Sequence, residues 1–427
     1  MTRAGALLCA ILATVVVSSA CGKPPTESAS SPDAGMSLPG DFGGSGPGTL
    51  VAATTLPTLD RRLEAVTSVA AKVTYTSTSG VTNELTEVTG TVFAPRGAPP
   101  EGGWPIIAYG HPTTGVRADC APSSSPTLLN LSTTIQGLVN SGYVVAMSDY
   151  QGLGNDRTYH PYLDATTAGY NLVDSVRAAR KLVADTSDRW VAFGVSQGGQ
   201  GAWAANELSA DYGAGLTLLG SVSVSAPLDI TGFADAAAGG TLTKEQQPTY
   251  SALLEALKNE YPDINLDDYR RGIVQSSWDE LLQCDYAKAD EREQLVDQIT
   301  PDDLRPSSVE ATDALRGRLA EASLPRRPLT APALVIYGGQ DPLVPPSWTD
   351  AALQRACELG DVIRIDLQPD KGHSDVDISP VIGWLGDRFR GDPAPNSCPS
   401  FITPPPPAPE EEPAAEEPEA IVEEGGG

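Results

Sequence analysis

A serine lies in the glycine-flanked pentapeptide Gly194-Val195-Ser196-Gln197-Gly198. The apolar run 189–193 precedes it and small residues follow it, which is the pattern of a strand, a tight turn and a helix. On such a turn the serine takes a strained backbone conformation that exposes its Oγ, and the glycines leave room where strand and helix approach closely. Glycine-rich loops are common, but with these flanks the pentapeptide predicts that Ser196 is a nucleophile.

A serine hydroxyl is a weak nucleophile at neutral pH and needs a general base whose pKa lies near that pH, a role that suits histidine. The chain has three histidines, and with a nucleophile on this kind of turn the acid and the histidine follow it in the sequence. Only His373 lies after Ser196. It follows the apolar run 362–367 in a polar loop, so the sequence predicts His373 as the base.

The acid that orients the histidine should also lie just past the end of a strand. Asp341 ends the segment 334–341, which begins with an apolar run, and it lies 32 residues before His373. That spacing leaves room for one helix and one strand, so Asp341 is the predicted acid. Four other aspartates compete with it because they lie in the last strand or in the histidine loop: Asp366, Asp370, Asp375 and Asp377.

The tetrahedral intermediate of acyl transfer carries an oxyanion that needs hydrogen-bond donors fixed in advance. One predicted donor is the backbone N–H of Gln197, the residue after the nucleophile. The second should come from the loop 110–115, which follows an apolar strand. Pro112 has no N–H, so Thr113 is the predicted donor, with Thr114 as the next choice.

The other two histidines are interpreted as structural. His111 is expected to shape the loop that carries Thr113. His160 is expected to bond Asp149 or Asp156 near the rim of the site.

Short apolar strands alternate with helical segments over most of the chain. Residues 73–94 alternate Thr, Val and Ser around a Ser-Gly turn, which predicts two antiparallel edge strands. Further strands are predicted at 106–109, 143–147, 190–193, 219–224, 334–337 and 362–365. Helical spacing at 170–183 lies between two of them. This alternation predicts an α/β fold with a mostly parallel central sheet and helices on both faces.

The segment between 229 and 330 interrupts the alternation. It contains charged stretches with helical spacing at 253–259, 278–282 and 292–299 and no convincing strand, so it predicts an inserted helical cap. The sequence thus divides into a signal peptide (1–20), a flexible linker (21–57), a first core part (58–230), a cap (231–330), a second core part (331–400) and a disordered tail (401–427).

The amino-terminal residues 1–20 have the features of a secretory signal: one arginine, an uncharged apolar run and small residues at the end. Cys21 follows directly, and two outcomes stay open. Either Cys21 is lipidated, as in a bacterial lipoprotein tethered by the Gly, Pro and Ser-rich segment 21–57, or the protein is freely secreted.

The carboxyl-terminal tail is rich in proline and glutamate and too poor in apolar residues to fold. Its eight glutamates account for part of the net charge of −27, so the remaining chain is itself acidic. A nucleic-acid partner is therefore excluded, and the oligomeric state stays open.

Four cysteines remain in the exported part of the chain, and an even number outside the cell predicts two disulfides. Three pairings are possible. We favour Cys120 with Cys284 and Cys357 with Cys398, because the second bond would hold the carboxyl-terminal segment against a predicted helix near residue 350. A zinc site is not expected, since no two cysteines lie at metal-ligand spacing.

Six strings together carry a likeness to a known family: YGHPTTGVRADCAPS (109–123), SDYQGLGNDRTYHPYLDA (148–165), GVSQGGQGAW (194–203), SAPLDI (225–230), GGQDPLVPP (338–346) and GHSD (372–375). The chain resembles the secretory lipases of the α/β-hydrolase superfamily, from about Leu59 to Cys398. The resemblance implies hydrolysis of carboxylic esters, often long-chain acylglycerols, by Ser196, Asp341 and His373 under a helical cap. It also implies a Cys120–Cys284 bond. Hydrolysis by these three residues needs no cofactor, so none is expected. The lipid-anchor candidate and the acidic tail are not features of that family.

These observations predict a lipase or carboxylesterase (EC 3.1.1) with an ester or lipid substrate. The same triad serves amides and alcohols, so a peptidase or an acyltransferase is the alternative within enzymes. A non-catalytic surface protein that binds lipid is the alternative from another class.

Overall fold

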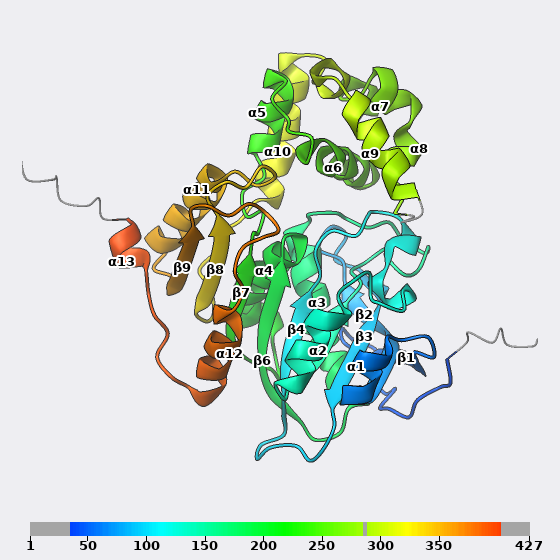
Figure 1. The fold of residues 1–427 in the computed structure, drawn as a ribbon, viewed down its shortest axis with the longest axis vertical. Coiled ribbons are helices and arrows are strands. Elements are labelled where there is room, and N and C mark those ends of the chain that lie inside the picture. Colours follow the sequence, from blue (N-terminus) through cyan, green and yellow to red (C-terminus); the bar gives the residue numbers. More distant parts are fainter. Residues whose placement is uncertain (1–34, 285–287, 403–427) are drawn as a thin grey trace, which may run out of the picture. The chain divides into compact units, whose positions relative to one another are not determined.

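The computed structural model of the protein describes residues 35–284 and 288–402. Its central sheet has nine strands in the order β1-β2-β3-β5-β4-β6-β7-β8-β9 (Figure 1). The strands are β1 Leu50–Thr55, β2 Thr67–Thr78, β3 Leu85–Pro95, β4 Trp104–Gly110, β5 Val144–Ser148, β6 Thr186–Val195, β7 Thr217–Val224, β8 Ala333–Gly338 and β9 Ile363–Gln368. β1, β2 and β3 pair antiparallel and β3 pairs antiparallel with β5, whereas the neighbours in β5-β4-β6-β7-β8-β9 pair parallel, which confirms the mostly parallel sheet.

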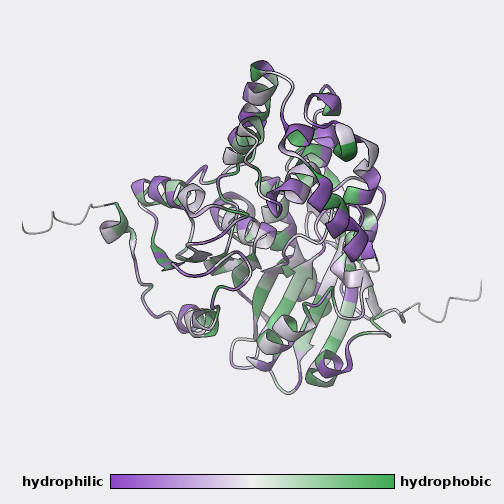
Figure 2. Ribbon diagram, turned by 45° about the horizontal axis from the view of Figure 1, so that its top comes forward, coloured by the Kyte–Doolittle hydropathy of each residue, from purple (hydrophilic) through white to green (hydrophobic). Residues whose placement is uncertain are grey.

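Helices cover both faces of the sheet, and the alternation of side chains along the strands decides which face each residue serves. In β4, Ile106 and Ala108 pack on the face that α3 and α4 cover, whereas Ile107 and Tyr109 pack on the face of α1, α2 and α12. The helices are α1 Arg61–Val66, α2 Ser132–Asn140, α3 Ala165–Leu182, α4 Gln197–Tyr212, α11 Pro346–Glu358, α12 Pro380–Arg390 and α13 Cys398–Phe401. Figure 2 shows the apolar strands enclosed between these layers.

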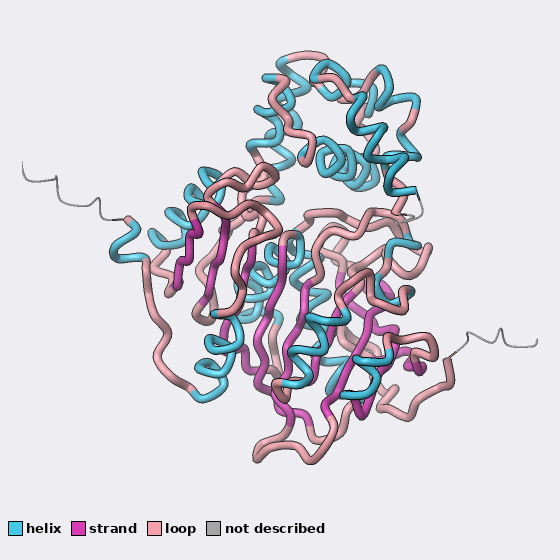
Figure 3. Tube along the Cα trace, viewed as in Figure 1, coloured by secondary structure: helices cyan, strands magenta, loops and turns pink. Residues whose placement is uncertain are grey.

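Between β7 and β8 the described residues form helices and loops with no strand (Figure 3). These are α5 Gly232–Gly239, α6 Gln246–Glu260, α7 Gly272–Ser276, α8 Trp278–Leu281, α9 Ala289–Gln298 and α10 Val309–Ala322, with short 3₁₀ turns η3 Leu266–Asp268 and η5 Pro301–Leu304. Helices lie where the sequence predicted them, in α6, α8 and α9, and α5, α7 and α10 are additional. We call residues 231–330 the cap.

Two expectations at the amino-terminal side were wrong. β1 lies inside the segment interpreted as linker, where it pairs with β2, and Leu50 and Ala53 are buried. This short strand was not predicted because Gly and Pro residues surround it in the sequence. Neither β2 nor β3 is an edge strand, because β2 also pairs with β1 and β3 also pairs with β5. The predicted signal peptide, the lipidation of Cys21 and most of the tail fall outside the described residues.

Candidate active site

Ser196 lies between the last residue of β6 and the first residue of α4. Its φ of 53° and ψ of −121° are strained for a residue with a side chain. The turn is fixed from both sides: Ser196 N–H donates to the Val224 carbonyl at 2.8 Å, and the Ser196 carbonyl accepts from the N–H groups of Gly199 and Gln200 at 2.8 and 3.1 Å. The strain predicted for the pentapeptide is therefore present and held in place by the sheet and the helix.

The two flanking glycines are needed because backbones approach closely at this turn. A Cβ on Gly194 would lie 1.9 Å from the Gly198 carbonyl oxygen, and a Cβ on Gly198 would lie 1.9 Å from the Gly110 carbonyl oxygen. No side chain fits at either distance. The second contact also shows that the start of the 110–115 loop packs directly on the first turn of α4.

The side chains of Ser196, His373 and Asp341 form one hydrogen-bonded line. His373 Nε2 lies 3.0 Å from Ser196 Oγ, and His373 Nδ1 lies 2.7 Å from Asp341 Oδ2. The three residues follow β6, β9 and β8, so the carboxyl ends of parallel strands bring together residues up to 177 positions apart. Asp341 is buried, and its Oδ1 accepts the N–H groups of Leu343 and Val344, both at 2.8 Å.

Two of the competing aspartates, Asp375 and Asp377, have other partners. Asp375 Oδ1 accepts the N–H of Gly372 at 2.6 Å and the residue is exposed. Asp377 accepts the N–H and hydroxyl of Ser379, both at 2.9 Å. In the described part of the chain, the carboxylate bonded to His373 is that of Asp341.

One contact at the site was missed from the sequence. Ser225, just past the end of β7, donates its hydroxyl proton to the His373 carbonyl at 2.8 Å. This bond fixes the histidine loop to the neighbouring strand. The string SAPLDI begins at Ser225, but nothing in its spacing indicates a partner 148 residues away.

The two proposed oxyanion donors lie on neighbouring segments. Gln197 is the first residue of α4, so its N–H has no carbonyl one turn earlier to bind. Thr113 is exposed, and its Oγ1 lies 2.8 Å from the Tyr162 hydroxyl. Tyr162 was not singled out in the sequence, and it anchors the loop that carries Thr113.

His111 and His160 are both buried, and the hydrogen-bond partners of their rings are residues other than Ser196 and His373. His111 shapes its loop, as expected, with Nδ1 2.7 Å from the Pro112 carbonyl oxygen and Nε2 3.3 Å from the Asp149 carbonyl oxygen. Burial lowers the pKa of His111. The predicted partners of His160 were wrong: it contacts the Gln151 carbonyl and the Gln197 side chain instead of Asp149 or Asp156.

Covalent and ionic links join the loop after β4 to the cap. Cys120 is bonded to Cys284, with a Cα–Cα distance of 5.5 Å. Arg117 contacts Glu255 of α6 at 3.2 Å and Asp279 of α8 at 3.0 Å. The second disulfide joins Cys357 of α11 to Cys398 of α13, so both bonds follow the favoured pairing.

A cation site does not follow from the one cluster of potential ligands in the described ranges, which consists of Asp119, Cys120 and Cys284. Its two sulfurs are consumed by the disulfide, so they cannot act as thiolates. No helix among the described residues is both long and apolar enough to cross a membrane.

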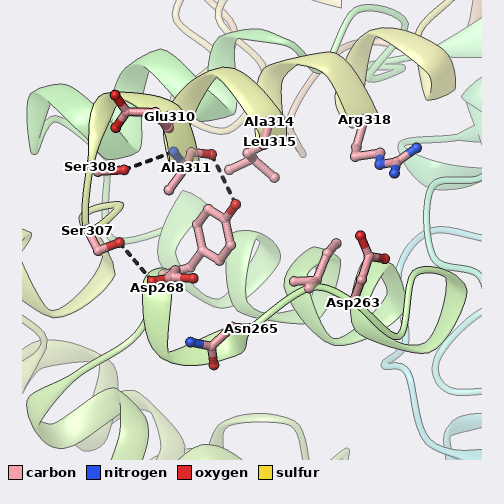
Figure 4. A pocket seen from close by; sticks show the side chains of 12 residues that line it. Asp263, Asn265, Asp268, Ser307, Ser308, Glu310, Ala311, Ala314, Leu315 and Arg318 are labelled. Carbon is pink, nitrogen blue, oxygen red and sulfur yellow. Dashed lines mark hydrogen bonds between the residues drawn. The ribbon is translucent and has the colours of Figure 1, made fainter.

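The cap also holds a surface pocket of about 370 Å³ (Figure 4). Residues of η3 and α10 line it, and it contains hydrogen bonds from Ser307 to Asp268 at 2.8 Å and from Tyr269 to the Ala311 carbonyl at 3.0 Å. None of its lining residues belongs to the serine, histidine and aspartate line. The pocket therefore does not include Ser196.

Comparison with known proteins places the chain in a family. A profile described as secretory lipase matches residues 125–397, and the chain belongs to this family. No curated protein matches the sequence. The family supports an ester-bond hydrolase of the lipase and esterase class, and its description suggests export.

Three solved structures illustrate the fold that this chain shares with known proteins. The closed state of Candida antarctica lipase A is 18% identical with a TM-score of 0.66, over 86% of this chain and 90% of that one. A protein from Legionella pneumophila is 20% identical with a TM-score of 0.63, over 82% of this chain and 98% of that one. The rice cell wall degrading esterase LipA of Xanthomonas oryzae is 21% identical with a TM-score of 0.61, over 84% and 97%. These likenesses establish the α/β-hydrolase fold.

Proposed function

We propose that the protein is an exported serine hydrolase, a lipase or carboxylesterase, that cleaves carboxylic esters through an acyl-enzyme on Ser196. The observation that carries the proposal is the line from Ser196 Oγ to His373 Nε2 at 3.0 Å and from His373 Nδ1 to Asp341 Oδ2 at 2.7 Å. The same three residue types in this order define a nucleophile, a base and the acid that orients the base.

In the proposed reaction Ser196 Oγ attacks the ester carbonyl carbon while His373 Nε2 takes the hydroxyl proton. The carbon–oxygen bond to the leaving alcohol then breaks, and His373 returns the proton to that alcohol. Water repeats the two steps on the acyl-enzyme and releases the acid. Asp341 keeps the proton of the neutral imidazole on Nδ1, which leaves Nε2 free to accept.

The oxyanion that forms in both steps is assigned to the N–H groups of Gln197 and Thr113. Both segments are held rigidly, since Gly198 packs against Gly110 and the Thr113 side chain contacts Tyr162. Preorganised donors of this kind stabilise the transition state without a cost of reorientation during the reaction. The chemistry requires no metal and no cofactor.

The substrate is proposed to enter between the cap and the core loops. Apolar side chains of α5 and α6 form one cluster with Val116, Tyr162 and Leu163 of the core. The cap therefore contacts the core beside the loop that carries Thr113. The acyl chain of a bound ester would extend from its carbonyl group into this region. The side chains of this cluster are buried against one another, and their apolar character suits a lipid or other ester with a hydrocarbon chain.

Export and lipid attachment rest on the sequence. The features of residues 1–20 support export, and Cys21 is proposed as the lipidated residue that tethers the protein to the cell envelope. The mass of the mature amino terminus tests the anchor. A mass without an acyl modification on Cys21 contradicts it.

Hydrolysis of a nitrophenyl ester series from acetate to palmitate tests the proposed function, with Ser196→Ala as the matched control. Turnover that depends on Ser196 supports a serine ester hydrolase, and the chain length of the best substrate separates lipase from esterase. Equal rates in the control, or transfer to an added alcohol or amide cleavage without ester hydrolysis, contradict the proposal.

A further inference from the structure

His160 is a buried residue whose two ring nitrogens have partners that fix its protonation. Nδ1 lies 2.9 Å from the Gln151 carbonyl oxygen, which only accepts hydrogen bonds, so Nδ1 carries the proton. Nε2 lies 2.8 Å from the side-chain nitrogen of Gln197. In the neutral ring Nε2 is an acceptor, so the Gln197 amide donates to it. The opposite amide orientation would bring two acceptors into contact.

Burial keeps this ring neutral. It lowers the pKa of His160 to about 3, so the imidazole stays uncharged over the range in which an esterase works. Gln197 is 1% exposed and His160 is 3% exposed, so water does not compete for the bond between their side chains.

We propose that His160 is a positioning residue of the oxyanion hole, which holds Gln197 through its side chain so that the Gln197 N–H points at the developing oxyanion. The inference rests on the proposed function, because it assigns this N–H as a donor. A side chain anchored at Nε2 limits rotation of the peptide between Ser196 and Gln197. That peptide carries the donor, so its orientation decides whether the hole is preorganised.

His160 also contacts the two tyrosines that hold the other half of the hole. Its ring stacks on Tyr150 at 5.9 Å between centroids and lies 6.0 Å from Tyr162. Tyr150 donates its hydroxyl proton to the His111 carbonyl at 3.0 Å, and Tyr162 contacts Thr113 at 2.8 Å. The imidazole of His160 therefore contacts Gln197, which carries the first proposed donor, and also the two tyrosines that hold the loop of Thr113, the second proposed donor.

Two neutral substitutions separate the contacts of His160. Asparagine places a polar atom near the position of Nδ1 and can keep the bond to Gln151, whereas glutamine places one near the position of Nε2 and can accept from Gln197. His160→Asn should lower kcat about tenfold to a hundredfold, with KM changed less than twofold. This loss of kcat is a part of the loss expected when one oxyanion donor is removed altogether. His160→Gln should restore kcat to within about fivefold of the wild type.

The controls separate positioning from folding. Thermal unfolding of both variants identifies any loss of kcat that results from lower stability of the fold. The acidic limb of the pH profile of kcat/KM should be the same as in the wild type, because the proposed base is His373. Wild-type kcat in His160→Asn, or equal losses in both variants that track the melting temperature, overturn the inference. If His160→Asn does not fold, Gln197→Met breaks the same bond from the other side: a loss of kcat supports the inference, and wild-type kcat overturns it. Failure of the proposed function is recognised separately, by wild-type turnover that persists in Ser196→Ala.

Discussion

Replacing Asp341 by asparagine changes one atom and, from the geometry of the site, reverses the histidine tautomer. Asp341 Oδ1 accepts two backbone N–H groups at 2.8 Å, and Oδ2 accepts from His373 Nδ1 at 2.7 Å. In Asp341→Asn the amide oxygen must stay with the two N–H groups, because an NH₂ group cannot accept from them. The NH₂ group then faces His373 Nδ1, which must give up its proton.

The proton of His373 moves to Nε2, the nitrogen 3.0 Å from Ser196 Oγ, where it blocks acceptance of the hydroxyl proton. A wrong tautomer of this kind lowers kcat by about 10⁴, which is a barrier increase of about 5 kcal/mol. The fold should be unaffected, because the side chain keeps its shape and its backbone bonds.

Initial rates on nitrophenyl butyrate measure this effect, with equal melting temperatures as the check on folding. Asp375→Asn is the matched control: it lies two residues after the histidine and is exposed, so its kcat should stay within about twofold. An Asp341→Asn enzyme within tenfold of the wild type would refute the assignment of the acid. A large loss of kcat in Asp375→Asn would indicate that the acid lies in the histidine loop instead.

Three further predictions concern stability. Burial, and after it the nearby Asp164 carboxylate, raises the pKa of Glu260 from 4.5 to about 8. The folded state therefore holds a proton that the unfolded state has released. The stability that this proton contributes is complete below about pH 4.5 and is lost as the pH rises through about 8. Glu260→Gln should therefore melt higher than the wild type at pH 9, and an identical pH dependence of melting would contradict this. Gly198→Ala should yield unfolded or insoluble protein, since its Cβ would lie 1.9 Å from a backbone oxygen. The control Gly317→Ala has open space around it in α10 and should raise the free energy of unfolding by up to about 1 kcal/mol. A soluble and fully stable Gly198→Ala protein would show that the close approach at Gly198 is wrong. Removing the bond between Cys357 and Cys398, 41 residues apart, should cost about 4 kcal/mol in urea unfolding, and a cost below about 1 kcal/mol would show that the bond adds little.

The sequence predicted the parts of the site that depend on local pattern. A strained turn needs small residues around Ser196, and the order of serine, acid and histidine left one histidine to choose. The parallel strands were predicted from short apolar runs between helical segments. β1 was missed because its six residues follow a Gly and Pro-rich stretch, and its partner strand β2, rather than its own sequence, determines its pairing.

The supporting contacts could not be predicted because they join segments that are distant in the chain. Gln197 contacts a histidine 37 positions earlier, and Ser225 contacts the carbonyl of a residue 148 positions later. The type of each residue is compatible with many partners, and only the folded sheet decides which one lies within hydrogen-bond distance. The partners of His160 were wrong for this reason.

The central claim is that an acyl group is transferred to Ser196, and mass spectrometry of the enzyme quenched during turnover of a nitrophenyl ester tests it directly. The account predicts an added acyl mass on the peptide that contains Ser196, and no such mass in Ser196→Ala. Ester turnover with the acyl mass on another residue, or on the Ser196→Ala protein, would contradict it.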